Sequence, residues 1–273
     1  MSGVTRTPST VALASGLTLS YVEQGDVAGP ALVLLPGPTD SWLSYLPVLD
    51  RMPPSIRTIA VSQRGHGDSD KPATGYQVED FATDAVLLLD ALGIERAALA
   101  GHSGSCFVAR RLAIDCPERV MGLVLEASPT TLRGDVGLEH LVASVISRLE
   151  DPIGLDFARS ILVDTSSSEI APDMLEQFAG ELVKVPTRVW RETFAALLQY
   201  DDLSDLERIT APTLLIWGDA DGLVGRQMQE QLAAALPCED LVVYAGVGHT
   251  PRWENPTRFV ADAAAFVSRL SVP

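Results

Sequence analysis

The chain contains little cysteine and little positive charge. Its three cysteines, Cys106, Cys116 and Cys238, are odd in number and form no C-x-x-C pair, which argues against a disulfide framework and a zinc site. A reducing compartment, the cytoplasm, is therefore the expected location. Twenty basic residues stand against 36 acidic ones, so the formal net charge is −16 at pH 7. This charge disfavours nucleic acid and anionic membranes as partners.

Long hydrophobic runs are also missing. No segment approaches the roughly 18 consecutive apolar residues of a membrane span, and Met1 to Pro8 contains no apolar stretch of signal-peptide length. No cluster has metal-ligand spacing and no glycine-rich dinucleotide fingerprint is present, so we expect neither metal nor cofactor. With 273 residues, 47% of them hydrophobic and 21% charged, the composition indicates a soluble globular protein with a full core.

Short apolar runs alternate with helical patterns, which favours an α/β fold with a mostly parallel sheet between helices. The first two strands, at 11–13 and 17–22, are expected to be antiparallel because they flank a turn at Ser15 and Gly16. Further strands are expected at 31–35, 58–61, 96–100, 120–126, 213–217 and 241–244. Helices are expected at 41–49, 78–92, 106–112 and 257–270.

Strand signals vanish between residues 129 and 211. Apolar residues recur there at helical spacing, as in Leu138, Leu141, Val142, Val145 and Leu149. Two further helices are expected near 174–182 and 189–198, with a loop at 165–168. We therefore expect an α/β core made of residues 1–128 and 212–273, and a helical cap made of residues 129–211.

A serine between small residues follows one strand and precedes a helix. The segment Gly101-His102-Ser103-Gly104-Ser105 fits the G-x-S-x-G pattern, except that serine replaces the last glycine. Such a sharp turn strains the backbone of the central serine and exposes its hydroxyl for nucleophilic attack. Because Ser105 is still small, strand and helix can approach closely. Ser103 is therefore the predicted nucleophile.

A serine hydroxyl needs a base to remove its proton, and the chain has four histidines. His102 neighbours Ser103 and is expected to point away from it. His66 lies in a glycine-rich turn, and His140 falls on a helix of the cap. His249 follows the last strand, in a loop whose side chains can reach the carboxyl edge of the sheet. We interpret His249 as the general base.

The base needs a carboxylate on its other ring nitrogen to fix the tautomer and stabilise the imidazolium. Asp219 and Asp221 lie just past the strand at 213–217, and Glu126 ends an earlier strand. At this point the chain resembles the α/β-hydrolase family, whose triad follows the order serine, acid, histidine. In that family the acid usually ends a Gly-x-x-Asp pattern, which implies Asp221. Asp219 and Glu126 remain the alternatives.

The resemblance covers most of the chain. Three further segments are similar to the family's R-G-x-G-x-S turn, its helix-to-strand link and its closing segment: 64–69, 115–120 and 248–256. The resemblance implies the α/β-hydrolase fold, with an eight-stranded, mostly parallel sheet flanked by helices. The cap would then follow the sixth strand.

One segment departs from the family pattern. Relatives usually carry His-Gly-x after the third strand, and the backbone N–H of x binds the oxyanion together with the residue after the nucleophile. The resemblance implies Gly104 as the latter donor, but Pro38 occupies position x and has no N–H. Losing one donor costs about 2.7 to 4 kcal/mol of transition-state stabilisation. Thr39 is the nearest substitute, through its N–H or hydroxyl; otherwise Pro38 only shapes the pocket wall.

We expect the Pro38→Tyr variant to turn over a simple ester faster than the parent, because the replacement restores a backbone N–H at the oxyanion position. Initial rates on a short p-nitrophenyl ester measure this effect. Unchanged or lower turnover in a correctly folded variant contradicts the hypothesis of a missing donor.

These features predict a serine esterase or lactonase acting on a small or medium substrate through an acyl-enzyme on Ser103. Two alternatives stay open. One is a non-esterase member of the fold, such as a cofactor-free oxygenase, a lyase or a carbon–carbon bond hydrolase. The other is a ligand-sensing protein with a slow triad. A haloalkane dehalogenase or epoxide hydrolase is disfavoured, because those relatives need an aspartate in place of Ser103.

Six residues near the serine turn or in the cap are candidates for an apolar substrate pocket: Trp42, Phe107, Trp190, Phe194, Val224 and Thr250. A cap of this length favours a neutral, partly apolar small molecule that is enclosed from water. The sequence does not indicate whether the protein is a monomer or an oligomer.

Overall fold

The computed structural model describes residues 6–270. Met1 to Thr5, part of the stretch in which no signal peptide was expected, lie outside the described residues. Eight strands form one sheet: β1 Ser9–Ala12, β2 Thr18–Gln24, β3 Ala31–Leu35, β4 Arg57–Val61, β5 Ala97–His102, β6 Val120–Glu126, β7 Thr213–Gly218 and β8 Cys238–Tyr244. Their order is β1-β2-β4-β3-β5-β6-β7-β8. Only β1–β2 and β2–β4 are antiparallel, which confirms the predicted fold.

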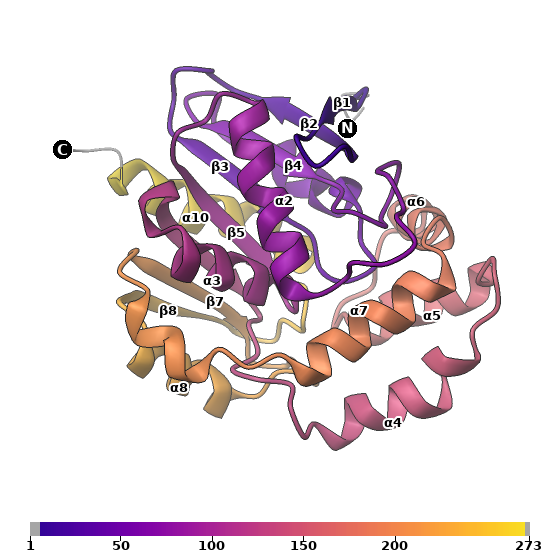
Figure 1. Ribbon diagram of the computed structural model, residues 1–273. Helices are drawn as coiled ribbons and strands as arrows, with labels where there is room; N and C mark the ends of the chain where they lie inside the picture. Colours follow the sequence, from indigo (N-terminus) through magenta and orange to yellow (C-terminus); the bar gives the residue numbers. More distant parts are fainter. Residues whose placement is uncertain (1–5, 271–273) are drawn as a thin grey trace.

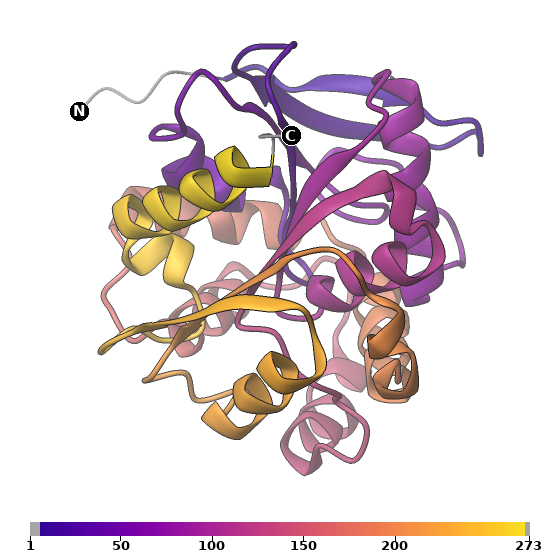
Figure 2. The ribbon, with the colours of Figure 1, turned by 90° about the vertical axis from the view of Figure 1, so that its left-hand side faces the viewer.

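Helices cover both faces of this sheet (Figures 1 and 2). The helices of the α/β part are α1 Leu46–Leu49, α2 Val78–Ala91, α3 Ser105–Asp115, α8 Arg226–Ala235, α9 Pro251–Glu254 and α10 Pro256–Leu270. Strand β3 shows how one apolar run serves two cores. Val33 and Leu35 join the core under α2 and α3, whereas Leu32 and Leu34 join the core under α1 and α10, because successive strand residues point to opposite faces.

Between β6 and β7 the chain forms helices only: α4 Val136–Ser144, α5 Leu155–Asp164, α6 Pro172–Val183 and α7 Thr187–Gln199, with short 3₁₀ turns at Ile146–Arg148 and Leu203–Arg208. They lie together at one end of the sheet (Figure 1). Residues 165–168 form a loop without regular structure, as expected. Within residues 6–270, no helix is both long and apolar enough to cross a membrane.

Besides the one-turn helix α9, two helices, α5 and α8, are absent from the sequence-based prediction. On α5, Leu155 and Val163 point outward and are 46% and 51% exposed, which blurs the apolar face that marks a helix. On α8 only Gln229 and Leu232 are buried, so its apolar face is too narrow to show in the sequence. Both helices are stabilised by packing against the rest of the folded chain, which the sequence pattern does not reveal.

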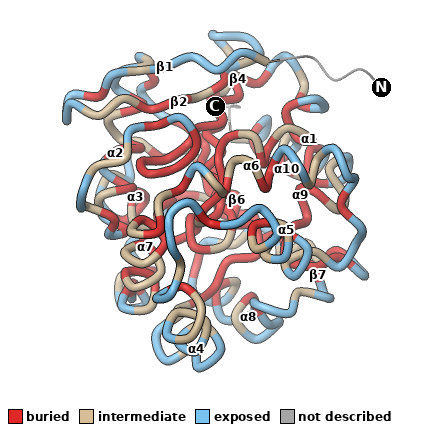
Figure 3. Tube along the Cα trace, turned by 90° about the vertical axis from the view of Figure 1, so that its right-hand side faces the viewer, coloured by how far each residue is buried: buried red, intermediate tan, exposed pale blue. Residues whose placement is uncertain are grey.

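The apolar residues of α4 are at most partly buried, and two of them, Leu141 and Val142, pack against the edge of the core. No residue of this helix is buried, and Figure 3 shows it as intermediate and exposed along its length. Leu138 and Leu141 instead line a large pocket under the cap. Helical spacing therefore identified the helix correctly, but its apolar face meets a cavity.

Candidate active site

The turn at Ser103 joins β5 to α3. Ser103 has a φ of +52°, a left-handed conformation that non-glycine residues rarely adopt. Its N–H donates to the Glu126 carbonyl at 2.9 Å, and its own carbonyl accepts from Cys106 N–H at 2.9 Å. A Cβ on Gly101 would lie 2.7 Å from the Ser105 carbonyl oxygen, so glycine permits the close approach of strand and helix. Ser103 lines the large pocket.

Loops after β7 and β8 bring a carboxylate to a histidine. His249 Nδ1 lies 2.8 Å from Asp221 Oδ2. Asp221 Oδ1 accepts from the N–H groups of Leu223 and Val224 at 2.8 and 3.0 Å. The ionised carboxylate of Asp221 can only accept a hydrogen bond, so Nδ1 of the neutral His249 ring carries the proton and donates to it. Nε2 is then left as the acceptor. His249 lines the same pocket as Ser103.

The other two candidate acids have different partners. Asp219 Oδ1 accepts from Gly246 N–H at 2.6 Å, and Glu126 binds the N–H and guanidinium of Arg252. Among the hydrogen bonds of residues 6–270, only Asp221 reaches the His249 ring. The structure therefore brings together His249 and the acid that the resemblance implied.

The remaining histidines lie apart from these roles. His140 is exposed on α4. His66 is buried in the turn after β4, and burial lowers its pKa to about 4. His102, expected to point away from Ser103, lines the same pocket and packs against His249 with ring centroids 4.9 Å apart. Its Nε2 lies 2.9 Å from the His249 carbonyl oxygen. Burial holds the pKa of His102 well below its usual range, so the neutral ring donates this bond.

A loop of the cap also holds His249. Its N–H donates to the Thr165 carbonyl at 3.1 Å. Next to it, Glu254 accepts from Gly248 N–H at 2.9 Å and from Ser167 N–H at 3.1 Å. The backbone of the histidine loop is therefore bonded directly to the cap loop at 165–168.

The segment after β3 forms the pocket wall beside Ser103. Pro38 and Thr39 both line the pocket, as does Gly104. Thr39 has a φ of +75°, which is strained for a β-branched residue. A Cβ on Gly104 would lie 2.9 Å from Pro38 Cγ and 3.0 Å from Leu197 Cδ1, so the proline ring packs over Gly104. The expected oxyanion position thus combines a residue that lacks an N–H with a strained neighbour.

A buried ion cluster, absent from the sequence-based prediction, lies beneath this wall. The guanidinium of Arg252 contacts Asp40 Oδ2 at 2.8 Å and Glu126 Oε2 at 3.3 Å, and it lies over the rings of Tyr45 and Trp253. The cluster joins the loop after β3, which contains Pro38 and Thr39, to the end of β6 and to the segment after His249. Burial raises the pKa of Asp40 to about 6, although the charge of Arg252 acts in the opposite direction.

We expect Asp40 to make stability depend on pH. Its folded pKa of about 6 lies above its ordinary value of 3.8, so between these pH values the folded state binds more protons at this carboxyl. Its contribution to the free energy of unfolding therefore falls as pH rises from about 4 to 6. The Asp40→Asn variant has no titratable carboxyl at this position.

Urea unfolding of parent and Asp40→Asn from pH 4 to 8 tests this effect, because the other titrating groups are common to both proteins. Their difference in unfolding free energy should change between pH 4 and 6 and stay level above pH 7. A constant difference across the whole range contradicts the prediction.

We expect Gly218→Ala to lower the free energy of unfolding by about 1–3 kcal/mol. A Cβ at this end of β7 would lie 2.2 Å from the Val247 carbonyl oxygen, so the loops that carry Asp221 and His249 must shift. Gly222→Ala is the matched control, since a Cβ there meets nothing within 4 Å. Urea unfolding of both variants measures the difference; equal stability of the two contradicts the packing argument.

The large pocket has a volume of about 510 Å³, measured as the space that the centre of a water molecule can occupy. Four of the six predicted pocket residues line it: Trp190, Phe194, Val224 and Thr250. The prediction is wrong for Trp42 and Phe107, which are buried in the two cores on either side of the sheet. Both lie near the site in sequence, but their side chains point between helix and sheet.

Eight aliphatic cap residues that the prediction missed also line the pocket: Leu132, Leu138, Leu141, Ile146, Ile161, Leu162, Leu182 and Leu197. Its charged lining residues are Asp40, Asp135 and Asp164; among the residues described, no lysine or arginine lines the pocket. The site therefore offers a large apolar volume with carboxylates and without a cation.

Comparison with known proteins identifies the family of the chain. Residues 30–256 match the family of the alpha/beta hydrolase fold. The chain is 26% identical over 275 residues to a non-heme chloroperoxidase of Streptomyces lividans, covering 94% of this chain and 99% of that protein. It is similar to the crystal structure of a hydrolase from Pseudomonas aeruginosa, with 26% identity, a TM-score of 0.80 and coverage of 96% and 98%. An esterase from Exiguobacterium antarcticum shares the fold at 19% identity, with a TM-score of 0.85 and coverage of 96% and 100%. The chain therefore belongs to the α/β-hydrolase family.

Proposed function

We propose that the protein is a serine hydrolase that cleaves a neutral carboxylic ester or lactone. The observation that carries this proposal is the pairing of His249 Nδ1 with Asp221 at 2.8 Å, at a pocket that the strained Ser103 also lines. A nucleophile, a base and an orienting acid are the three groups that acyl transfer through a serine requires.

The proposed reaction has two halves. Ser103 Oγ attacks the ester carbonyl while its proton passes to His249 Nε2, and Asp221 stabilises the imidazolium through Nδ1. His249 then gives the proton to the leaving alcohol. In the second half His249 takes a proton from water, which attacks the acyl-enzyme and restores Ser103. Gly104 N–H binds the oxyanion in both halves, and we assign the second donor to Thr39.

The lining of the pocket supports a neutral, partly apolar substrate. Aliphatic and aromatic cap residues form a large part of its wall, and its three charged residues are aspartates. A substrate that also carried a free carboxylate would bring this charge into a pocket without a cationic partner. The carboxylate would lose its hydration and would be repelled by the aspartates. An uncharged acyl or alcohol group avoids both.

A second candidate function is a non-esterase reaction on the same site, such as that of a cofactor-free oxygenase or a lyase. The observation that favours it is Pro38, which lacks the N–H usually directed at the oxyanion. The similarity to a protein named as a non-heme chloroperoxidase is compatible with either candidate.

A fluorophosphonate probe and a small ester panel test the proposal together. We expect the parent protein to react with the probe, Ser103→Ala to lose all labelling, and p-nitrophenyl butyrate to be hydrolysed faster than the mono-p-nitrophenyl ester of succinic acid. Labelling without hydrolysis of any ester favours the second candidate or a ligand-sensing role. Labelling that persists in Ser103→Ala overturns the assignment of the nucleophile.

A further inference from the structure

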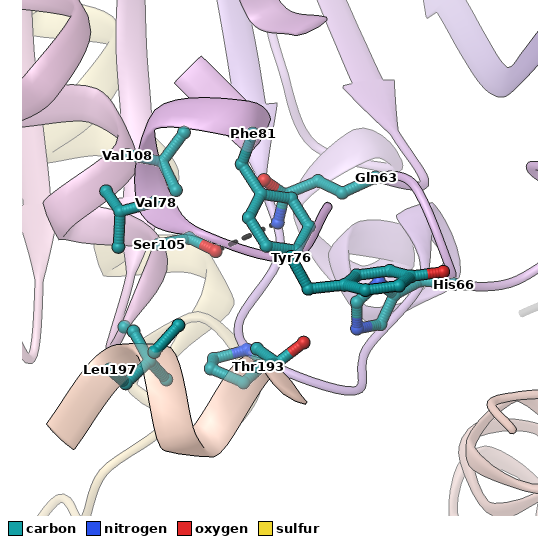
Figure 4. A pocket seen from close by; sticks show the side chains of 12 residues that line it. Gln63, His66, Tyr76, Val78, Phe81, Ser105, Val108, Thr193 and Leu197 are labelled. Atoms are coloured by element: carbon teal, nitrogen blue, oxygen red, sulfur yellow. Dashed lines mark hydrogen bonds between the residues drawn. The ribbon is translucent and has the colours of Figure 1, made fainter. Parts of the chain in front are cut away.

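A small second cavity lies between cap helix α7 and the turn that follows β4. Figure 4 shows Thr193 of α7 on one side and Gln63 and His66 of the turn on the other. This cavity shares Pro38, Gly104 and Leu197 with the catalytic pocket. Only the wall behind the expected oxyanion position separates the two spaces.

Three polar side chains of this cavity each have one buried atom without a hydrogen-bond partner among the described residues. The atoms are Gln63 Oε1, His66 Nε2 and Thr193 Oγ1, on residues that are 8%, 2% and 5% exposed. Buried polar atoms in folded proteins are nearly always hydrogen-bonded. Three such atoms around one cavity therefore point to a bound molecule.

The hydrogen-bonding roles of the Gln63 and His66 atoms are fixed by their neighbours, whereas the Thr193 hydroxyl can donate or accept. Gln63 Nε2 donates to the Pro36 carbonyl at 3.0 Å and to Ser105 Oγ at 2.9 Å. Flipping this amide would place its oxygen against the Pro36 oxygen, so Oε1 is the acceptor that is left without a partner. His66 Nδ1 lies 2.7 Å from the Arg64 carbonyl oxygen and must donate to it. Since burial keeps the pKa of His66 low, at about 4, the ring is neutral and Nε2 is an acceptor.

The ligand must therefore offer two donors to the Gln63 and His66 acceptors, and it can offer an acceptor to the Thr193 hydroxyl. Water has this pattern. The centre of a water molecule can occupy a volume of about 20 Å³ in this cavity. By the same measure one water needs roughly 10–15 Å³, so the cavity has room for one. We propose that this cavity binds a single water, which donates to Gln63 Oε1 and His66 Nε2 and accepts from Thr193 Oγ1.

The bound water connects the cap to the loop after β3, the proposed oxyanion loop. Thr193 belongs to α7, and Gln63 holds the Pro36 carbonyl, two residues before Pro38. Thr193 and Gln63 are thus positioning residues, which act on the reaction through the loop that contains Pro38 and Thr39. This second part of the inference rests on the proposed function, because it concerns the rate of ester hydrolysis.

Thr193→Val and Thr193→Ser form a matched pair for the test. Valine keeps the shape of threonine without the hydroxyl, whereas serine keeps the hydroxyl. Crystal structures at about 1.5 Å resolution should show one water peak within hydrogen-bond distance of all three atoms in the parent, a peak retained in Thr193→Ser and lost in Thr193→Val. We expect Thr193→Val to melt about 2–4 °C below Thr193→Ser. Its kcat on p-nitrophenyl butyrate should be several-fold lower at unchanged KM.

Each other outcome overturns a stated part. No water peak in the parent, or a direct hydrogen bond between Thr193 and His66, overturns the water site. A peak combined with equal kcat in the two variants overturns the coupling to the oxyanion loop. The electron density and the melting temperature do not depend on hydrolysis, so failure of the proposed function is distinguishable from failure of the water site.

Discussion

Asp221→Asn is expected to hydrolyse a simple ester about 10⁴-fold more slowly than the parent, with the fold intact. The two backbone N–H groups of Leu223 and Val224 that bind Asp221 Oδ1 would hold the amide oxygen of asparagine in the same place. Its NH₂ group would then face His249 Nδ1 and force that nitrogen to accept. The proton would move to Nε2, which could no longer take the proton of Ser103.

Asp219→Asn is the matched control for this variant. Asp219 binds Gly246 N–H at 2.6 Å, so the amide oxygen of asparagine can replace it, and we expect kcat to stay within a few-fold of the parent. Steady-state kinetics on p-nitrophenyl butyrate compares the two. A large loss of kcat in Asp219→Asn, together with a normal kcat in Asp221→Asn, would identify Asp219 as the acid.

Arg252→Met is expected to lower the free energy of unfolding by about 3–5 kcal/mol, because it leaves the buried carboxylates of Glu126 and Asp40 without their cation. Arg252 and Glu126 side chains are fully buried and Asp40 nearly so, so water cannot replace the lost partner. Urea unfolding at pH 7 measures the loss.

Two further variants separate charge pairing from packing. Arg269→Met removes an exposed arginine that pairs with Glu239, and its effect should be within about 0.5 kcal/mol of zero. The triple variant Arg252→Met, Glu126→Gln, Asp40→Asn removes all three charges and should regain part of the lost stability. If the triple variant is no more stable than Arg252→Met, lost packing rather than unpaired charge explains the effect.

The features that the sequence predicted are those encoded over short stretches. Strands such as β3 are fully buried and therefore read as unbroken apolar runs, and the turn at Ser103 is marked by small residues whose role is steric. The acid and histidine follow strand ends, which parallel strands place at one edge of the sheet. Helix α5 escaped prediction because Leu155 and Val163 face outward.

The missed parts of the site depend on residues far apart in the chain. Arg252 and Asp40 are 212 positions apart, and no sequence pattern links the two positions. Their pairing follows only from the folded sheet edge. The cavity at Thr193 likewise joins α7 to a turn more than a hundred residues earlier. Trp42 and Phe107 show the converse error, since closeness to a motif in sequence does not fix the direction of a side chain.

The hydrogen bond from His249 N–H to the Thr165 carbonyl has a consequence for cap engineering. A chimera that receives its cap from a relative replaces the residue that anchors the His249 loop, even though Ser103, Asp221 and His249 are all retained. Such a graft must supply a carbonyl oxygen at the position of Thr165 and an amide N–H for Glu254 at the position of Ser167. A cap exchange that alters the pocket therefore also alters the support of the His249 backbone.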